Sequence, residues 1–395
     1  CRRCIMRVFL DNCRTTRVLP EVAQVVLNYM TNNFARPDGL YESAQEVYDD
    51  LTKAREFFAK SINADSGEEI LFTSGATESN NVALLGIARA NKTKGNHIII
   101  SALEHGSVMS IASQLKNEGF EVTVIPVDDE GFIKLEDLER AIRPSTILVS
   151  VIAVGHFVGS IMPLEEIGEI LSRQSHKIYF HTDAAEMYAK FPVDVKKFKV
   201  DLMSVSGHKF HAPKGVGFLY VKKGTKIEPI MYGAESFDKR RPGGENVPAI
   251  MGMKRAAELA IENIDSSLNN LRKLQEYFID KVESQIDHVV LNGPRGEKRT
   301  PYNVNFSFRF IEGEAISLAL SMEGVEVATG SACASEKLEP NYAILAIGGD
   351  HERAHGSIRF TFDRFTTKEQ IDYTVEKLKS VVSWLRKISP IKAGR

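Results

Sequence analysis

Residues 204–217 read Ser-Val-Ser-Gly-His-Lys-Phe-His-Ala-Pro-Lys-Gly-Val-Gly. A short apolar segment ends in this stretch, polar and cationic residues follow, and a Pro/Gly turn leads into another apolar segment. In sheets built from alternating strands and helices, the loops at strand ends bind ligands. Burial or neighbouring cations would lower the pKa of Lys209 and free its amine as a nucleophile. The stretch therefore predicts a lysine that forms a Schiff base; a solvated lysine beside a turn is the alternative.

The stretch belongs to a region, from about residue 68 to residue 222, in which strand-like and helix-like segments alternate. Short strands rich in Ile and Val are predicted at 69–73, 97–101, 121–126, 146–151, 177–181, 202–206 and 217–221. Helical patterns lie between several of them, at 79–91, 107–118 and 164–174. Strands separated by helices imply βαβ crossovers, so the sequence predicts an α/β fold with a mostly parallel sheet covered on both faces.

The pattern changes after about residue 250. Long helices are predicted at 248–263, 266–285 and 367–388, and shorter strands at 289–291, 303–308, 325–328 and 357–362. Helices and strands without strict alternation indicate a smaller α+β domain. The 395 residues exceed one typical core. We therefore expect a large domain over 15–255 and a small domain built from 1–14 and 256–395.

Composition excludes several classes of protein. The chain is 43% hydrophobic and 26% charged, with a formal net charge of −2, so no general basic field attracts nucleic acid or anionic membranes. The longest apolar run, 147–154, is too short to span a bilayer, and Asp11 interrupts the N-terminal apolar stretch too early for a signal peptide. Four cysteines are too few for a disulfide-built protein of this size. We expect a cytoplasmic protein without membrane or direct nucleic-acid binding.

A second stretch, residues 73–80, reads Thr-Ser-Gly-Ala-Thr-Glu-Ser-Asn, follows a strand and opens a helix. Small residues at Gly75 and Ala76 let the backbone approach an anion, and free N–H groups at a helix start bind phosphate. Thr77 adds a hydroxyl donor. The alternative is a helix start capped by Thr77 or Ser79, without a ligand.

Two more polar residues follow predicted strands. Asp183 could pair with a protonated pyridine nitrogen, or it could simply cap a helix. His105 could stack on a cofactor ring and move protons, although a lone histidine is more often structural.

These four features occur in the chain order phosphate, ring, pyridine nitrogen and Schiff base. The order resembles the pyridoxal-phosphate (PLP) enzymes of fold type I, and more specifically the cysteine desulfurase branch of the class V aminotransferases. The resemblance runs nearly end to end, and its motifs together are highly specific. The matching stretches are 9–12, 15–16, 72–81, 104–105, 183–185, 206–209, 213–217, 241–248, 330–333 and 357–360.

The resemblance implies a role for each matching residue. Lys209 would carry PLP as a Schiff base and act as acid and base at the substrate Cα. Thr77, Ser206 and His208 would bind the phosphate together with the backbone around Gly75 and Ala76. Asp183 would pair with the pyridine nitrogen, and His105 would stack on the ring. Arg359 would bind the substrate carboxylate through its planar guanidinium, with Asn12 nearby.

Cys333 lies in the small-residue stretch 328–335, Ala-Thr-Gly-Ser-Ala-Cys-Ala-Ser. No apolar period protects it, so the stretch predicts an exposed thiol on a mobile loop. A buried structural cysteine is the alternative, and the resemblance favours the reactive thiol. Cys1 and Cys4 form a CxxC pair without a second pair or a histidine at metal spacing, so no metal site is expected.

Several positions depart from the family pattern. His156 stands where an Asn usually bonds the phenolate oxygen of PLP, and Glu186 stands where a Gln is usual. We hypothesise that His156 and Glu186 form a compensating pair, because a lone carboxylate beside a phenolate would be repulsive. Gly244 replaces a Thr that reaches the phosphate of a partner subunit. Cys13-Arg14 replaces small residues near the substrate.

The resemblance implies a PLP-dependent cysteine desulfurase that converts L-cysteine to L-alanine and leaves a persulfide on Cys333. The persulfide would pass to an acceptor protein, such as an iron–sulfur scaffold or a thiolation protein, and the enzyme would be a homodimer. Two alternatives stay open. One is selenocysteine cleavage or another PLP reaction on the same fold, and the other is a non-catalytic homologue that acts as a protein partner.

Overall fold

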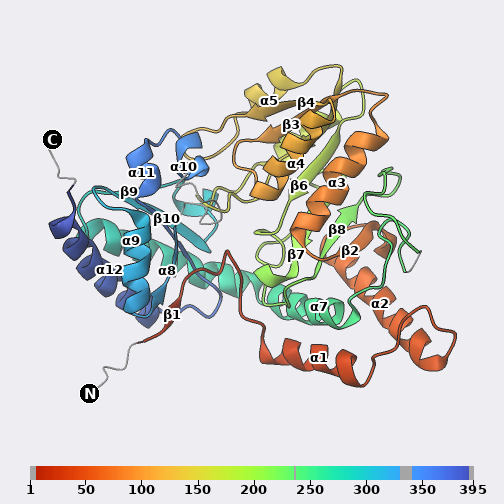
Figure 1. Ribbon diagram of the computed structural model, residues 1–395, viewed down its shortest axis with the longest axis horizontal. Coiled ribbons are helices and arrows are strands. Elements are labelled where there is room, and N and C mark those ends of the chain that lie inside the picture. Colours follow the sequence, from red (N-terminus) through yellow and green to blue (C-terminus); the bar gives the residue numbers. More distant parts are fainter. Residues whose placement is uncertain (1–5, 235–236, 330–339, 391–395) are drawn as a thin grey trace.

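The computed structural model describes residues 6–234, 237–329 and 340–390. The two larger of the three sheets in these ranges are each packed against helices and lie side by side, and both ends of the described chain lie near the four-stranded sheet (Figure 1). The larger sheet has seven strands in the order β2-β8-β7-β6-β5-β3-β4. Their bounds are Ile70–Thr73 (β2), Gly217–Val221 (β8), Leu202–Ser206 (β7), Tyr179–Asp183 (β6), Thr146–Ser150 (β5), His97–Ser101 (β3) and Glu121–Ile125 (β4).

Only β8 runs against its neighbours in this sheet, pairing antiparallel with both β2 and β7. The strands β3, β4, β5, β6 and β7 pair in parallel, as the βαβ pattern predicts. The mostly parallel α/β fold expected from the sequence is confirmed. Because β2 points the same way as the other parallel strands, the loops that follow their carboxyl ends meet at one edge of the sheet.

Apolar side chains on successive strand residues divide between the two faces of the sheet. Ile98 and Ile100 of β3 pack into a cluster with helices α3 (Ala76–Ala90) and α4 (Gly106–Asn117). Ile99 packs into the other cluster, which includes residues of α2 (Glu42–Ser61), α6 (Leu164–Ser172) and α7 (Val247–Ile261). This period of two buries both faces of the sheet. The helices α1 (Pro20–Thr31) and α5 (Leu135–Ala141) complete this part of the chain.

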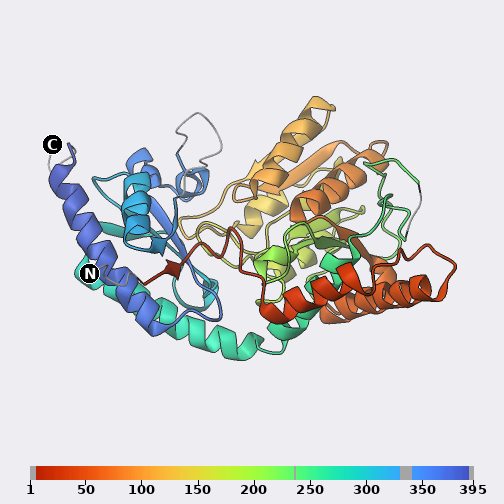
Figure 2. The same cartoon turned by 60° about the horizontal axis from the view of Figure 1, so that its bottom comes forward.

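The smaller sheet has four antiparallel strands in the order β12-β13-β10-β9. Helices α8 (Ile264–Gln285), α9 (Gly313–Met322) and α12 (Lys368–Ile388) contribute to its hydrophobic core. The long helix α8 runs from the end of α7 along this sheet (Figure 2). Strand bounds are Val289–Leu291 (β9), Asn303–Phe308 (β10), Ala328–Thr329 (β12) and Ser357–Thr361 (β13).

The predicted strand at 325–328 is two short strands, and they pair with different partners. Val325–Glu326 (β11) pairs in parallel with Val8–Phe9 (β1), whereas β12 pairs with β13. Short helices α10 (Tyr342–Ala346) and α11 (His351–His355) precede β13, yet their apolar side chains pack with the core of the larger sheet. The proposed division into domains at residues 14–15 and 255–256 stays a prediction.

Candidate active site

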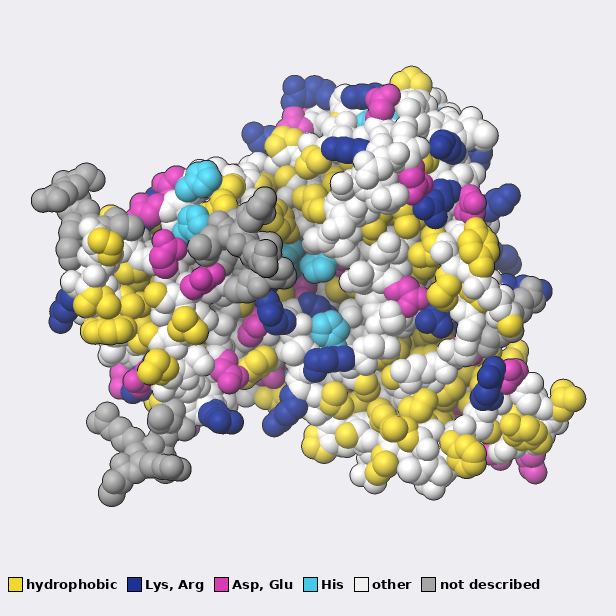
Figure 3. Space-filling model, viewed as in Figure 1, with side chains coloured by type: hydrophobic (Ala, Val, Ile, Leu, Met, Phe, Trp, Pro, Cys, Tyr) yellow, Lys and Arg dark blue, Asp and Glu magenta, His cyan; other side chains and the backbone are white. Residues whose placement is uncertain are grey.

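A cavity of about 700 Å³ lies at the edge where the parallel strands of the larger sheet end. Residues from both sheets line it, from Cys13 near the N-terminus to Arg359 of β13. Figure 3 shows histidine, lysine and arginine side chains around the hollow between the two parts of the molecule. Most of the predicted site residues line this one cavity, namely Gly75, Ala76, Thr77, His105, His156, Asp183, Glu186, Ser206, His208, Lys209 and Arg359.

The loop after β7 places Lys209 in the cavity. Gly207–Lys209 forms a single 3-10 turn directly after Ser206, so the lysine is displayed at the end of the strand. The Lys209 ammonium donates to Glu186 Oε1 at 2.8 Å and to the backbone oxygen of Cys13. Burial opposes its charge, but the Glu186 carboxylate, together with Cys13, holds the pKa of Lys209 above its usual value. The lowered pKa expected from the sequence is therefore wrong for Lys209 in this structure.

The turn after β2 forms a cradle for an anion. Gly75 precedes α3 with φ +147° and ψ −178°, and no side chain caps the free N–H groups of that helix. A Cβ on Gly217 would lie 2.3 Å from the oxygen of Val205 and 2.7 Å from the Cα of Gly75, so only glycine allows this approach. Neither Thr77 nor Ser79 caps α3, so the capping interpretation of this stretch is wrong.

His208 stands beside this cradle. Its Nδ1 atom is buried and has no hydrogen-bond partner among the described residues. Burial, helped by the charge of Lys209, lowers the pKa of His208 to about 4. A neutral ring with an unsatisfied nitrogen, next to free helix N–H groups and the Ser206 hydroxyl, suits an incoming phosphate. These residues fit PLP, whose phosphate the cradle would hold and whose aldehyde Lys209 would meet.

Asp183 ends β6 and is 3% exposed. Its Oδ2 accepts from Asn80 Nδ2 at 2.8 Å, and its Oδ1 accepts from the backbone of Ala185 at 3.0 Å. No described α-helix begins at this point, so Asp183 is not a helix cap. The contact with Asn80 joins the carboxylate to α3. Asn80 is a positioning residue that the sequence interpretation did not single out.

His105 and His156 stand together on another wall of the cavity, with ring centroids 5.4 Å apart. His105 is the N-cap of α4 and accepts from the backbone of Ser107 through Nδ1. His156 is buried, and burial together with the positive side chains nearby holds its pKa well below the usual value, so the ring is neutral. Its Nε2 lies 3.4 Å from the Tyr342 hydroxyl, while its Nδ1 has no partner among the described residues.

The hypothesis that His156 pairs with Glu186 is wrong. Glu186 instead accepts from Lys209 through Oε1 and from Lys190 Nζ through Oε2, at 2.8 and 2.7 Å. Burial alone would raise the pKa of Glu186, but the two lysine charges hold it well below its usual range. Two cations lie closer than the neutral imidazole and satisfy the carboxylate. The sequence interpretation missed Lys190, although its spacing of four residues from Glu186 was a usable signal.

Arg359 reaches the cavity from β13. Its Nη1 donates to the backbone oxygen of His156, and its Nη2 donates to Asp11, both at 3.1 Å. The guanidinium also lies 5.3 Å from the centroid of the Phe157 ring. Its Nε is buried without a partner among the described residues, which leaves a donor for a further acceptor. Arg359 is therefore a fixed cation on the cavity wall.

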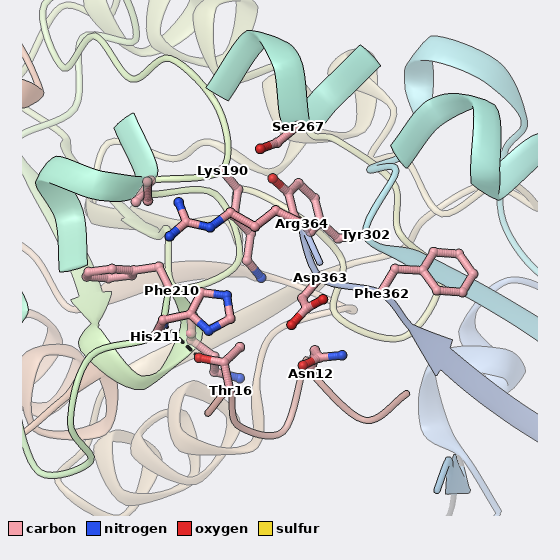
Figure 4. Close-up of a pocket in the computed structure, with 13 residues that line it drawn as sticks. Asn12, Thr16, Lys190, Phe210, His211, Ser267, Tyr302, Phe362, Asp363 and Arg364 are labelled. Carbon is pink, nitrogen blue, oxygen red and sulfur yellow. Dashed lines mark hydrogen bonds between the residues drawn. The ribbon is translucent and has the colours of Figure 1, made fainter. Parts of the chain in front are cut away.

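Asn12 does not line the large cavity. Its amide donates to the backbone oxygens of Phe9 and Thr361, at 3.2 and 2.8 Å, and it lines a smaller pocket beside Tyr302 and Lys190 (Figure 4). Cys13 and Arg14, in contrast, do line the large cavity, as the sequence indicates. Asn12 therefore holds the N-terminal segment against β13.

Two predicted positions have other outcomes. Cys333 lies outside the described residues, as do Cys1 and Cys4. Gly244 lines a separate cavity of about 170 Å³ with Ser74 and Arg241, and a Cβ there would meet only open space.

Within the described ranges, no cluster of His, Cys, Asp and Glu could hold a metal ion. No helix in those ranges combines the length and apolar character needed to cross a membrane.

The α/β fold and the lysine, carboxylate and anion cradle around one cavity define a fold type I PLP enzyme. The Aminotransferase class-V profile matches residues 8–374, so the chain belongs to this family, whose members depend on PLP. The resemblance to the cysteine desulfurase branch is also confirmed.

Similar proteins carry names from that branch. "Cysteine desulfurase IscS" of Dictyoglomus turgidum is 46% identical over 385 residues, which are 98% of this chain and 97% of that protein. "Cysteine desulfurase, mitochondrial" of Eremothecium gossypii is 41% identical, over 97% of this chain and 78% of that protein. A solved structure titled "NIFS-LIKE PROTEIN" aligns with a TM-score of 0.90 at 33% identity, covering 96% of this chain and all of that one.

Proposed function

We propose that the protein is a PLP-dependent cysteine desulfurase that converts L-cysteine to L-alanine and places a persulfide on Cys333. The observation that carries the proposal is the position of Lys209 in one cavity with Asp183 and the cradle at Gly75. That arrangement suits a cofactor held by its phosphate, its ring nitrogen and its aldehyde. The names of the relatives above support the choice of cysteine as substrate.

Gly75, Ala76, Thr77, Ser206 and His208 would hold the phosphate, and Asp183, kept in place by Asn80, would face the ring nitrogen. His105 would stack on the ring, and His156 and Glu186 would stand near its oxygen substituent. When bound, PLP supplies an electron sink for the Cα of an attached amino acid.

Lys209 would hold the cofactor through its amine and later move the proton at the substrate Cα. Arg359 would bind the substrate carboxylate through its planar guanidinium. The Cys333 thiol would form an S–S bond with the substrate sulfur as the bond between that sulfur and Cβ breaks. The atoms balance, because cysteine and one protein thiol become alanine and one protein persulfide.

The test measures alanine and sulfide from cysteine in the presence of a thiol reductant. Wild type should release alanine, and Lys209→Ala and Cys333→Ser should each lose at least about a hundred-fold, as expected when a covalent catalytic group is removed. Lys226→Ala, on the exposed surface away from the cavity, is the matched control. Selenocysteine as a second substrate separates selenocysteine cleavage from this reaction. Unchanged alanine release in Lys209→Ala would refute the proposal.

We also propose a cytoplasmic homodimer that passes sulfur to an acceptor protein. Large apolar side chains are exposed on α1 and α2 and in the segment between them, where they gather on the lower face of Figure 3. They include Leu27, Met30, Phe34, Leu40 and Tyr41. An exposed apolar patch of this kind is typical of a protein interface. Analytical ultracentrifugation tests the dimer, and a monomer at micromolar concentration would contradict it.

A further inference from the structure

The Glu186 carboxylate stands between two buried lysines. It lies 2.8 Å from the Lys209 ammonium and 2.7 Å from the Lys190 ammonium. The exposed fractions of the three side chains are 11% for Glu186, 15% for Lys209 and 8% for Lys190. At such burial the charges are weakly screened, so each pairing strongly affects the protonation of its partners.

Cys13 completes the arrangement around this carboxylate. Its Sγ lies 3.1 Å from Glu186 Oε1, and its backbone oxygen accepts from the Lys209 ammonium. Burial, aided by the nearby Glu186 charge, raises the pKa of the Cys13 thiol. Cys13 therefore keeps its proton and donates to the carboxylate, so one oxygen of Glu186 is shared between a thiol and the lysine.

Lys190 approaches Glu186 from behind the large cavity. Lys190 is not among the described residues that line that cavity, whereas it does line the smaller pocket of Figure 4. Its ammonium lies 5.2 Å from the centroid of the Tyr302 ring, a cation–π distance. A group that enters the large cavity and engages Lys209 thus leaves the contact between Glu186 and Lys190 in place.

We propose that Glu186 is a positioning residue that holds Lys209 as an ammonium before the cofactor binds, and that Lys190 remains its ion-pair partner once Lys209 is engaged. The inference rests on the proposed function, because it assumes that Lys209 condenses with an aldehyde. For that condensation the lysine would release its proton to solvent, so that its nitrogen could bond to the aldehyde carbon while the carbonyl oxygen left as water. The ion pair with Glu186 must break first.

Several other charged and titratable groups surround Lys209. They are Cys13, Arg14, His156, Asp183, Lys190, His208 and Arg359. Arg359 and Lys190 are cations, and the two histidines have pKa values lowered mainly by burial. Glu186 is the carboxylate whose oxygen lies within hydrogen-bond distance of the Lys209 ammonium. Its removal should therefore lower the pKa of Lys209.

The experiment measures the reactivity of Lys209 in cofactor-free protein at pH 8. Trace labelling with acetic anhydride, followed by peptide mass spectrometry, reports the neutral fraction of that one amine. A close opposite charge shifts a pKa by about 1–3 units, so Glu186→Gln should label about ten-fold faster or more. Lys190→Met removes a competing cation and should label more slowly. Glu169→Gln, which removes the carboxylate of a surface pair with Lys199, should match wild type.

A second readout follows cofactor loading. After mixing with PLP, the visible absorbance band of Glu186→Gln should rise faster than that of wild type. Glu186→Gln leaves Lys190 unpaired, so the double variant with Lys190→Met removes both buried charges and should still label faster than wild type. Equal labelling of Lys209 in wild type, Glu186→Gln and the double variant would overturn the inference. The labelling experiment needs neither cofactor nor cysteine. Failure to release alanine from cysteine would therefore refute the proposed function without affecting the test of Glu186.

Discussion

The turn at Gly75 offers a quantitative test of how the backbone holds the phosphate. Its φ of +147° and ψ of −178° lie in a region that is essentially restricted to glycine. Gly75→Ala adds a Cβ only 3.2 Å from Ser206 Oγ, a contact that the hydroxyl can relieve by rotating. The backbone conformation is therefore the main cost, at about 1–3 kcal/mol.

This conformational cost must appear in the free energy of unfolding, in the affinity for PLP, or be divided between the two. If the introduced alanine kept the glycine conformation, the free energy of unfolding of the cofactor-free protein would fall by about 1–3 kcal/mol. If the turn relaxed, binding would have to restore it, and the Kd for PLP would rise by about five- to 140-fold for the same 1–3 kcal/mol. We expect the two losses together to reach this range.

Urea denaturation of cofactor-free protein and equilibrium dialysis with PLP measure the two losses. Gly106→Ala is the matched control, because Gly106 also begins a helix, α4, and a Cβ there meets nothing within 4 Å. We expect the control to stay within about 0.5 kcal/mol of wild type in both assays. The role assigned to this turn would be refuted if Gly75→Ala also changed neither the free energy of unfolding nor the Kd for PLP. It would also be refuted if Gly106→Ala lost as much as Gly75→Ala.

Three further predictions use other residues. Burial raises the pKa of Glu104 from 4.5 to about 8, so the free energy of unfolding should fall as pH rises from about 4.5 to about 8. Glu104→Gln should reduce the loss of unfolding free energy between pH 5 and pH 8 by about 2–4 kcal/mol. Urea denaturation that gives the same loss for wild type and for Glu104→Gln would contradict this prediction. Thr367→Ala removes the capping box of α12 and should cost about 1 kcal/mol in urea denaturation, against no change for the exposed Ser380→Ala. Arg359→Lys should raise the KM for cysteine about ten- to one-hundred-fold with a smaller change in kcat, and an unchanged KM would exclude the carboxylate contact.

Local patterns predicted most of the larger sheet correctly. The strands at 97–101, 202–206 and 217–221 have the predicted bounds, because a short, largely apolar segment next to turn residues is a local signal. Pairings between distant segments could not be predicted this way. The β1–β11 pair joins segments more than three hundred residues apart, and its two-residue strands are too short to show a period.

The candidate site shows the same contrast. Gly75, His105, Asp183 and Lys209 could be predicted because each lies at or just after the end of a strand, and the parallel strands end at one edge of the sheet. Arg359, which lies within β13, could be placed at the site only through the family resemblance. The partners that orient them could not, since Asn80 meets Asp183 across 103 positions. The expected contact of His156 with Glu186 failed because two lysines lie nearer to the carboxylate.

The parallel pair of Val8–Phe9 with Val325–Glu326 has a consequence for biosynthesis. The first strand leaves the ribosome early but must wait for its neighbour until most of the chain has been made. All seven strands of the larger sheet, which end by Val221, can associate during that interval. The Asp11–Arg359 contact can form only afterwards, so this wall of the cavity is completed by one segment that is synthesised early and another that is synthesised late.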